Sequence, residues 1–478
     1  MYYILDNKRY KMVNNKSELK HALSNRQVSM ISLGGIVGAG LFVVSATALN
    51  AVGPAILISY ALTGLMVLFV MRMLGEMAIR KPDSGAFSTY ASDSLGRWAG
   101  FTIGWLYWWF WVLVVAFEAI LGANIFHHYF PEFPSWLFAV LCICLLACTN
   151  LMDVRKFGEF EFWFALIKVV AIIAFILFCI SALMGFWPLA PVENISGVGK
   201  ILENGGLFPH GYGAIFTGML LSMFTFFGVE MLSILAAESK DPARQIKKTT
   251  NLVILRIGLF YIISIFLVLC IVPWNAPGLK EMGTFQYVLH VLNVPGSRLV
   301  MDVIVFIAVT SVLNSGLYTA SRMLFSLSQR GDAAKSLSQV SKHGVPQAAV
   351  LACTLIALVA VAINYAFPEK VFMVLLSTMN AIGLLVYLVI ALSQIVSRSR
   401  LEKQGVKLDF KMWLFPWLSW FVVATILTVL GYMFFSEQHR YETIVTLSLA
   451  SFILIMSFVK KPHQLTQQAP VSSIIHKG

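Results

Sequence analysis

Charged residues are scarce in this sequence. Only 12% of its 478 residues are Asp, Glu, Lys or Arg, whereas an ordinary soluble domain has about 25%. Hydrophobic residues make up 58% of the chain, and long apolar runs recur along its whole length. This composition excludes an ordinary soluble domain and indicates a chain that crosses a membrane many times.

Cysteine is also scarce, and no two cysteines have the C-x-x-C spacing. The six cysteines all fall within apolar runs: Cys142, Cys144, Cys148, Cys179, Cys270 and Cys353. We therefore expect no zinc site and no disulfide framework, and we interpret these residues as small packing side chains in helices. The spans also lack H-E-x-x-H, G-x-S-x-G and aspartyl-pair patterns. The sequence predicts no metal, no cofactor and no enzyme activity.

Twelve apolar segments are long enough to cross roughly 30 Å of hydrocarbon. Residues 1–27 form a polar, basic tail before them and do not resemble a cleavable signal peptide. The predicted spans are Val28–Asn50, Pro54–Met77, Trp98–Phe126, Pro134–Leu151, Phe160–Leu183, Tyr212–Ala236, Leu252–Val272, Leu299–Ser328, Gln347–Ala366, Val371–Val396, Trp413–Phe435 and Thr443–Val459.

Lys and Arg gather in the connections on one side of these spans, which we call the basic face. The opposite face holds only Lys200, Lys280, Arg298, Lys370 and Arg440. Because cytoplasmic loops carry an excess of Lys and Arg, both termini are predicted to be cytoplasmic, including the tail 460–478. The net charge of +12 then fits an anionic membrane surface, and no nucleic-acid partner is expected.

The first span, "SMISLGGIVGAGLFVVSATALN", carries Gly34, Gly35, Gly38 and Gly40 near its middle. Each glycine inside a helix costs about 1 kcal/mol relative to alanine. A broken membrane helix is tolerated only where the freed backbone groups are buried in protein or line a cavity. Freed N–H groups suit a carboxylate, and freed carbonyls suit an ammonium or a cation. The alternative is close helix packing, because Gly34 and Gly38 have GxxxG spacing.

A second break is predicted in the sixth span. The stretch "MFTFFGVEMLS" carries Gly228 and, two residues later, the carboxylate Glu230. An ionisable residue at membrane depth is a functional candidate, and many transporters are inverted repeats with corresponding spans interrupted around one site. Two such breaks favour a transporter with a core of residues 28–396, divided into inverted five-span halves at 28–184 and 212–396. Residues 413–459 are then two additional spans.

Four long strings resemble one family. "SMISLGGIVGAGLFV" is similar to its first span, "GRWAGFTIGWLYWWFWVLVVAFEA" to its third, "GEFEFWFALIKVVAIIAF" to its fifth, and "SVLNSGLYTASRMLFSLSQRGDA" to its eighth span and following loop. The family is the amino acid–polyamine–organocation superfamily, specifically its bacterial amino acid permeases, and the chain looks most like the gamma-aminobutyrate (GABA) permeases. The resemblance implies an all-α, multi-pass inner-membrane protein with the leucine-transporter fold, that is, five plus five inverted helices and two more.

The resemblance also implies roles at the two breaks. The substrate carboxylate is expected on the backbone amides of Gly38, Ala39 and Gly40. The substrate ammonium is expected on the carbonyls of Ile36 and Phe224–Phe227. Phe224 is expected to be an aromatic gate over the site, although "MFTFFG" offers three aromatic side chains, and each can instead face lipid or the core.

Lys168 lies isolated in the apolar string "FWFALIKVVAIIAF". The resemblance places it where sodium-coupled relatives bind sodium. A protonated ammonium there can donate to the carbonyls of the broken first helix, and an ammonium kept from water releases its proton more readily. Lys168 is therefore predicted to couple transport to protons, with Glu230 sharing that task. The alternative is a salt-bridged structural lysine.

Other polar residues within the spans have less definite roles. Glu118 in the third span either attracts the distal ammonium of an omega-amino acid or pairs with polar groups between helices. Ser377 and Asn380 in "LLSTMNAIGLL" are candidates to line the cavity. Arg256 lies one turn from the basic-face end of its predicted span, and we expect its long side chain to reach the membrane surface.

Three function classes are compatible with these features. The first is a secondary active importer of a small zwitterionic amino acid, GABA above all, by proton symport with alternating access. The second is an exchanger of the same fold, and the third is a sensor that binds its ligand without moving it. Lys168 favours the importer because an exchanger needs no coupling ion, and the tails are short for a signalling domain. The expected partners are the amino acid, protons and membrane lipid. A neutral alpha-amino acid permease and the oligomeric state stay open.

Overall fold

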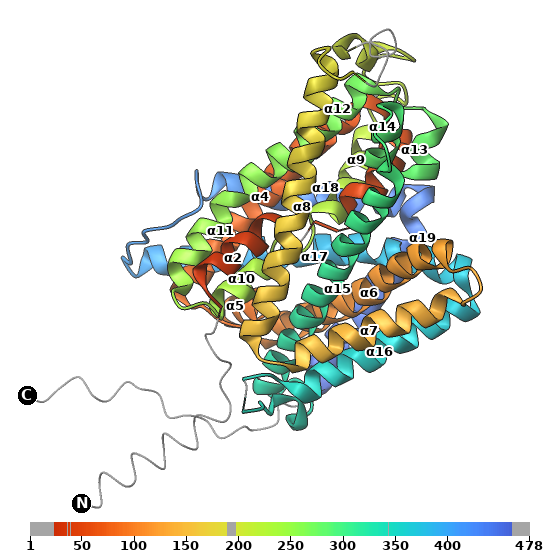
Figure 1. Ribbon diagram of the computed structural model, residues 1–478. Helices are drawn as coiled ribbons and strands as arrows, with labels where there is room; N and C mark the ends of the chain where they lie inside the picture. The colour runs from red at the N-terminus through yellow and green to blue at the C-terminus, as the bar shows by residue number, and fades with distance from the viewer. Residues whose placement is uncertain (1–22, 36, 39, 189–196, 343, 461–478) are drawn as a thin grey trace, which may run out of the picture.

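The structure is a computed structural model that describes residues 23–35, 37–38, 40–188, 197–342 and 344–460. In these ranges the chain is helical apart from its connections, and it contains no β-strand (Figure 1). Ten helical segments of the described chain are long and apolar enough to span a membrane. The predicted all-α, polytopic membrane fold is confirmed.

The described residues of the first half of the predicted core form seven α-helices. They are α2 (Asn25–Met30), α3 (Ser45–Val52), α4 (Ile56–Arg80), α5 (Ala86–Leu95), α6 (Arg97–Tyr129), α7 (Ser135–Leu151) and α8 (Val154–Leu183). Two π-helical segments, η1 (Ile31–Gly35) and η2 (Gly40–Val44), and the 3₁₀ turn η3 (Gly53–Ala55) lie between α2 and α4. The apolar stretch Asn25–Arg80 thus contains the first two predicted spans, and α7 is a shorter apolar helix.

The second half begins after the 3₁₀ segment η5 (Gly197–Leu202). Its helices are α9 (Ala214–Phe226), α10 (Met231–Ala237), α11 (Pro242–Arg256), the π-helix η6 (Ile257–Ile263), α12 (Ser264–Ile271), α13 (Pro277–Met282), α14 (Thr284–Val291), α15 (Ser297–Gln329), the 3₁₀ turn η7 (Lys335–Ser338), α16 (Gln347–Ala366) and α17 (Pro368–Lys403). The last two helices are α18 (Trp417–Phe435) and α19 (Glu437–Val459). Each of the twelve predicted spans thus overlaps helical segments of the described chain, and the first and the sixth are each divided into two helical parts.

The seventh span differs from its predicted bounds. Its helix begins at Pro242, ten residues before the predicted start, and runs on to Ile271. Asp241 caps this helix by accepting a hydrogen bond from the Arg244 N–H at 3.4 Å. Because the true start lies earlier, Arg256 is near the middle of the helical segment, and its side chain is fully buried. The prediction that Arg256 reaches the membrane surface is therefore wrong.

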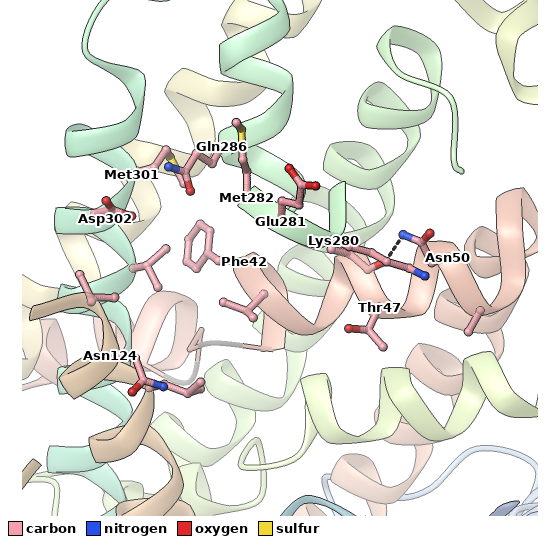
Figure 2. A pocket seen from close by; sticks show the side chains of 17 residues that line it. Phe42, Thr47, Asn50, Asn124, Lys280, Glu281, Met282, Gln286, Met301 and Asp302 are labelled. Carbon is pink, nitrogen blue, oxygen red and sulfur yellow. Dashed lines mark hydrogen bonds between the residues drawn. The ribbon is translucent and has the colours of Figure 1, made fainter. Parts of the chain in front are cut away.

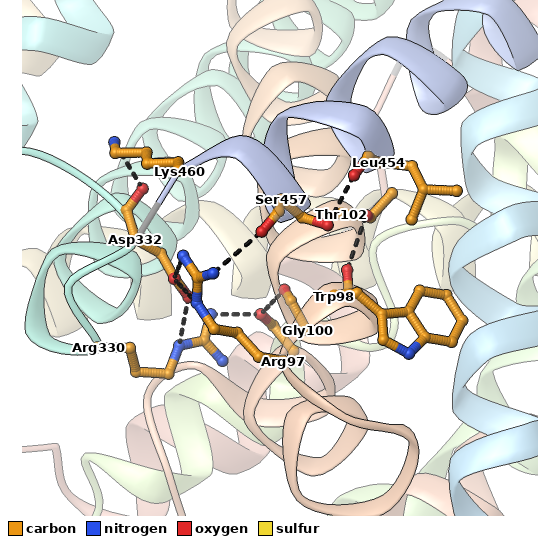
Figure 3. Close-up of polar contacts among 10 residues, drawn as sticks. Arg97, Trp98, Gly100, Thr102, Arg330, Asp332, Leu454, Ser457 and Lys460 are labelled. Atoms are coloured by element: carbon orange, nitrogen blue, oxygen red, sulfur yellow. Dashed lines mark hydrogen bonds and ion pairs between the residues drawn. The ribbon is translucent and has the colours of Figure 1, made fainter. Parts of the chain in front are cut away.

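A polar cluster at the basic face holds the last helix against the others (Figure 3). Arg97 at the start of α6 pairs with the buried carboxylate of Asp332 at 3.0 Å and donates to the carbonyl of Ser457 at 3.0 Å. Lys460 donates to the Asp332 carbonyl at 3.2 Å. These contacts fix the end of α19, whose other side chains, such as Phe458, are mostly exposed, as expected for a helix that faces lipid.

On the opposite face, the short helix α14 packs on η2 and on the first residue of α3. The ring of Phe42 lies edge-on to that of Phe285, with 5.1 Å between the ring centroids, and Phe285 also contacts Phe175 at 4.1 Å. The hydroxyls of Ser45 and Thr284 are hydrogen-bonded. This connection therefore packs directly on the helix that follows the first break.

Candidate functional site

The first break is present where the glycines predict it. The π-helical turn η1 ends at Gly35, the next begins at Gly40, and Val37 and Gly38 between them are not helical. The Val37 N–H donates to the Gly34 carbonyl at 3.1 Å, which turns the chain. Ile36 and Ala39, two of the predicted substrate contacts, lie outside the described residues.

The second break follows α9. Phe227 is extended, with ψ of 147°, and Gly228 has φ of +102°. A residue with a side chain adopts that backbone conformation only under strain, so a glycine is required there. Helix α10 resumes at Met231 and is short. The sixth span is therefore interrupted at Phe227–Glu230, as predicted.

The two breaks lie side by side. A Cβ atom added to Gly40 would stand 3.0 Å from the Cα of Thr225, and the Thr225 hydroxyl is 3.5 Å from the Gly40 carbonyl. A Cβ atom on Gly34 would stand 2.6 Å from the carbonyl oxygen of Ala165. The two glycines thus serve different purposes, because Gly34 permits packing of the first span on α8, whereas Gly40 brings the first break against the second.

Lys168 closes the first break. Its ammonium donates to the carbonyls of Gly35 at 3.1 Å and Val37 at 2.9 Å, and to the hydroxyl of Ser311 at 2.9 Å. The side chain is fully buried. A single ammonium of α8 therefore joins the freed carbonyls of the first span to α15.

Glu161 is a residue that the sequence interpretation missed. Its carboxylate accepts hydrogen bonds from Ser311 at 2.8 Å and from the Asn314 amide at 2.6 Å, and it is fully buried. Because Ser311 also accepts from Lys168, the hydroxyl bridges the two charges. The available signal was spacing, since Glu161 and Lys168 are two helical turns apart and share a face of α8.

Glu230 occupies the second break. One carboxylate oxygen accepts from the Tyr107 hydroxyl at 3.0 Å and the other from the Tyr387 hydroxyl at 3.1 Å. The Gly228 N–H also donates to both oxygens, at 3.1 and 3.0 Å. Glu230 and Lys168 thus belong to separate hydrogen-bond networks, one at each break.

Among the three aromatic side chains of "MFTFFG", the structure separates one from the others. Phe226 is fully buried and packs on Tyr261 at 4.8 Å between centroids. Phe227 packs on Phe110 at 4.3 Å. Phe224 is only half-buried and meets Phe117 of α6 edge-on at 5.7 Å. Phe224 is the one of the three that is not enclosed in the aromatic core.

Glu118 of α6 faces the first break. A Cβ atom on Gly38 would stand 2.9 Å from a carboxylate oxygen of Glu118 and 2.7 Å from Val312. Asn380 of α17 is half-buried, and no hydrogen bond to another described residue reaches its Oδ1. The Ser377 side chain lies outside the described residues. The structure therefore brings Glu118 to the first break and leaves the Asn380 Oδ1 without a hydrogen-bond partner among the described residues.

A cavity of about 770 Å³ approaches the breaks from the face opposite the basic one. Its wall includes Phe42, two residues after Gly40, and Leu121, one turn after Glu118. Its lining also includes the charged residues Lys280, Glu281 and Asp302 (Figure 2). The described residues contain no group of three or more His, Cys, Asp or Glu side chains that could hold a metal ion. Freed backbone groups, the Lys168 ammonium and the carboxylates of Glu118 and Glu230 are thus gathered at the two breaks.

Comparison with known proteins agrees with the resemblance. A family model described as "Amino acid permease" matches residues 27–461. The "Probable GABA permease" of Pseudomonas aeruginosa is 49% identical over 443 residues, which cover 93% of this chain and 93% of the relative. The "Gamma-aminobutyric acid permease" of Escherichia coli is 48% identical, over 95% and 97% of the two chains.

A more distant match is the "Aromatic amino acid transport protein AroP" of Escherichia coli, 36% identical over 87% of this chain and 90% of the relative. All these relatives are transport proteins, and none is named an enzyme. The function established by these matches is amino acid transport across a membrane that the chain spans many times. On this evidence, the chain belongs to the amino acid permease family.

Proposed function

We propose that this permease imports GABA by proton symport with alternating access, in the cytoplasmic membrane and with both termini in the cytoplasm. The observation that carries the proposal is the contact of Lys168 with the carbonyls of Gly35 and Val37. A charged group that can bind and release a proton occupies the freed carbonyls of the first break. A change in its protonation would alter how the two halves of that span are held.

The network around Lys168 supports a coupling role. Its ammonium joins three parts of the chain: the first span, α8 and, through Ser311, α15. Loss of the proton would leave a neutral amine with two N–H donors for these three acceptors, and the remaining bonds would lose the contribution of the charge, since hydrogen bonds to charged groups contribute about 1.5–3 kcal/mol each. Since α15 also carries Asn314, which binds Glu161, the same event would alter the contact between α8 and α15.

The substrate assignment depends on the relatives and on Glu118. The relatives named as GABA permeases are 49% and 48% identical, whereas the aromatic amino acid transporter is 36% identical. We assign the substrate carboxylate to the amides near Gly38 and Gly40 and the ammonium to Glu118. Glu230 is less suited to the ammonium, because Tyr107, Tyr387 and Gly228 already donate to its oxygens.

Alternating access is supported by the position of the cavity. The 770 Å³ cavity is on the face that has few Lys and Arg residues, and Phe42 is one of its lining residues. With the basic face in the cytoplasm, this cavity opens toward the outside. Transport then requires a second state in which the site opens toward the basic face.

The decisive experiment is uptake of labelled substrate by proteoliposomes with an acidic exterior, no sodium and no amino acid inside. We expect concentrative GABA uptake that a protonophore abolishes. Uptake only when an amino acid is loaded inside would identify an exchanger. Binding without any uptake in either condition would identify a sensor.

The substrate is tested by competition with a series from glycine to 5-aminovalerate. An unpaired charged end in a dry site costs several kcal/mol, so we expect chain length to be discriminated, with the strongest competition at the four-carbon acid. A monotonic preference for alpha-amino acids would identify a neutral amino acid permease and make Glu118 a structural residue.

A further inference from the structure

Arg256 stands apart from the other charged residues of the membrane-spanning segments. It is fully buried, near the middle of the apolar segment Pro242–Ile271, at the junction of α11 and the π-helix η6. None of its three guanidinium nitrogens has a hydrogen-bond partner among the described residues. π-helical turns inside helices frequently mark functional positions.

An unpaired guanidinium is costly in this position. Arginine stays protonated in proteins, and a charge kept from water is strongly unfavourable unless it is paired. Arg322 shows the usual arrangement in the same fold. It is equally buried, binds the Glu238 carboxylate at 3.1 Å and lies 3.7 Å from the ring centroid of Tyr318. Arg256 lacks any such partner in the described state.

The helix that carries Arg256 touches both breaks. Helix α11 packs against α2 and η1 of the first span and against α10 of the sixth (Figure 1). One turn further along, Tyr261 donates to the carbonyl of Thr225 at 3.4 Å, and Thr225 lies against Gly40. Because α11 starts at the basic face, Arg256 lies between that face and the level of the breaks.

Glu230 is a candidate partner within the protein. It lies within electrostatic range of Arg256, as do Tyr261 and Tyr387. Its oxygens, however, are occupied by Tyr107, Tyr387 and the Gly228 N–H. A carboxylate and a guanidinium thus share one buried region without a bond between them.

We propose that Arg256 is a carboxylate receptor used at a later stage of the transport cycle, when the site opens toward the basic face. The planar fork of its N–H groups fits the two oxygens of a carboxylate. This inference rests on the proposed transport function. The carboxylate comes either from the substrate as it leaves the site or from Glu230, if α10 moves about Gly228.

The first test is the melting temperature of the ligand-free protein. Arg256→Gln removes an uncompensated buried charge and is expected to raise the melting temperature. The matched control, Arg322→Gln, removes one partner of a buried ion pair and is expected to lower it. A decrease for Arg256→Gln as large as for the control would show that Arg256 is already paired and would overturn the proposal.

The second test measures labelled GABA transport in both directions. If the substrate is the source of the carboxylate, Arg256→Gln raises KM on the basic face at least about tenfold, with a smaller change on the opposite face. The KM of Arg256→Lys is expected between those of the wild type and Arg256→Gln, since lysine keeps the positive charge but lacks the planar pair of guanidinium N–H groups. Wild-type KM and rate in both directions for Arg256→Gln would overturn the proposal.

A double-mutant cycle distinguishes the second source. If Glu230 supplies the carboxylate, Glu230→Gln and Arg256→Gln reduce the transport rate by similar factors, and the double variant is no worse than either. If the substrate supplies it, the two effects multiply. The cycle can be run with any amino acid that the wild type carries, because all share a carboxylate. A wild type that carries none would contradict the proposed function, and the melting comparison would still test Arg256.

Discussion

The first and second breaks lie against each other, but side chains of opposite charge bind their freed backbone groups. The cation at the first break comes from another helix, whereas the anion at the second comes from the same segment. At the first break, Lys168 reaches across from α8 to the carbonyls of Gly35 and Val37. At the second, Glu230 folds back on its own segment and accepts from the Gly228 N–H. A cation thus meets carbonyls and an anion meets N–H groups, in the sense that the helix dipole favours.

The two hydrogen-bond networks also differ in how many parts of the chain they connect. Lys168 and Ser311 connect three parts of the chain, so a change in the charge of Lys168 alters the contacts among the first span, α8 and α15. The bond from Gly228 to Glu230 is local, and among the described side chains Tyr107 and Tyr387 connect Glu230 to α6 and α17. The first break is therefore better placed to convert protonation into movement. Four predictions test this contrast, in order of decreasing effect.

Lys168→Ala is expected to abolish gradient-driven accumulation of GABA in proteoliposomes. The variant loses the ammonium that donates to Gly35, Val37 and Ser311. The Ser311 hydroxyl, 3.5 Å from the Gly35 carbonyl, then provides only a long hydrogen bond to the first break. Lys335→Ala, at an exposed lysine of the basic face, is the control and should accumulate substrate normally. Accumulation by Lys168→Ala at the wild-type level would show that Lys168 is only a structural residue.

Gly40→Val is expected to weaken GABA binding about tenfold to hundredfold in a protein that still folds. The added side chain must displace Thr225, whose Cα is 3.0 Å from the new Cβ position, and such overpacking costs about 1–3 kcal/mol. Gly431→Val is the control, because its Cβ meets nothing within 4 Å. Unchanged affinity of Gly40→Val in a scintillation proximity assay would show that GABA binding does not depend on the close contact between the two breaks.

Glu230→Gln is expected to slow gradient-driven uptake about tenfold while GABA exchange continues. Loss of one charge-assisted hydrogen bond, worth about 1.5–3 kcal/mol, raises the barrier to net uptake by that amount. The amide keeps the size of the side chain but cannot carry a transported proton. The measurement compares net uptake with exchange in the same vesicles. Equal loss of both activities would instead indicate that Glu230 is needed to maintain the second break in every state.

Tyr387→Phe is expected to have the smallest effect. It removes one of the hydrogen bonds to Glu230 and should lower the free energy of unfolding by about 1 kcal/mol, seen as a lower melting temperature. Uptake should stay within about twofold of wild type. Tyr107→Phe, which removes the bond to the other carboxylate oxygen, should behave alike. Loss of uptake in either variant would mean that the hydrogen bonds at the second break are also required for transport, which would contradict the contrast between the two breaks.

Much of the fold and part of the candidate site could be predicted from the sequence. Apolar runs determine the helices, because a backbone in hydrocarbon must satisfy its own hydrogen bonds. The glycines of the first span and Gly228 indicate the two breaks for the same reason, and an isolated Lys168 stands out because charge is costly at that depth. These are local properties of the chain, so no knowledge of neighbouring helices is needed to recognise them.

The tertiary structure decided which side chains meet. Glu161 lies near the basic end of α8, close to Glu159, and resembles an interfacial carboxylate in sequence until Ser311 and Asn314 are brought to it. Arg256 was misplaced because the polar residues before Leu252 hide the true start of the helix at Pro242. The approach of Glu118 to Gly38 joins two spans far apart in sequence. Such partners follow from how helices pack, and the energy of a buried charge depends on the neighbours that packing supplies.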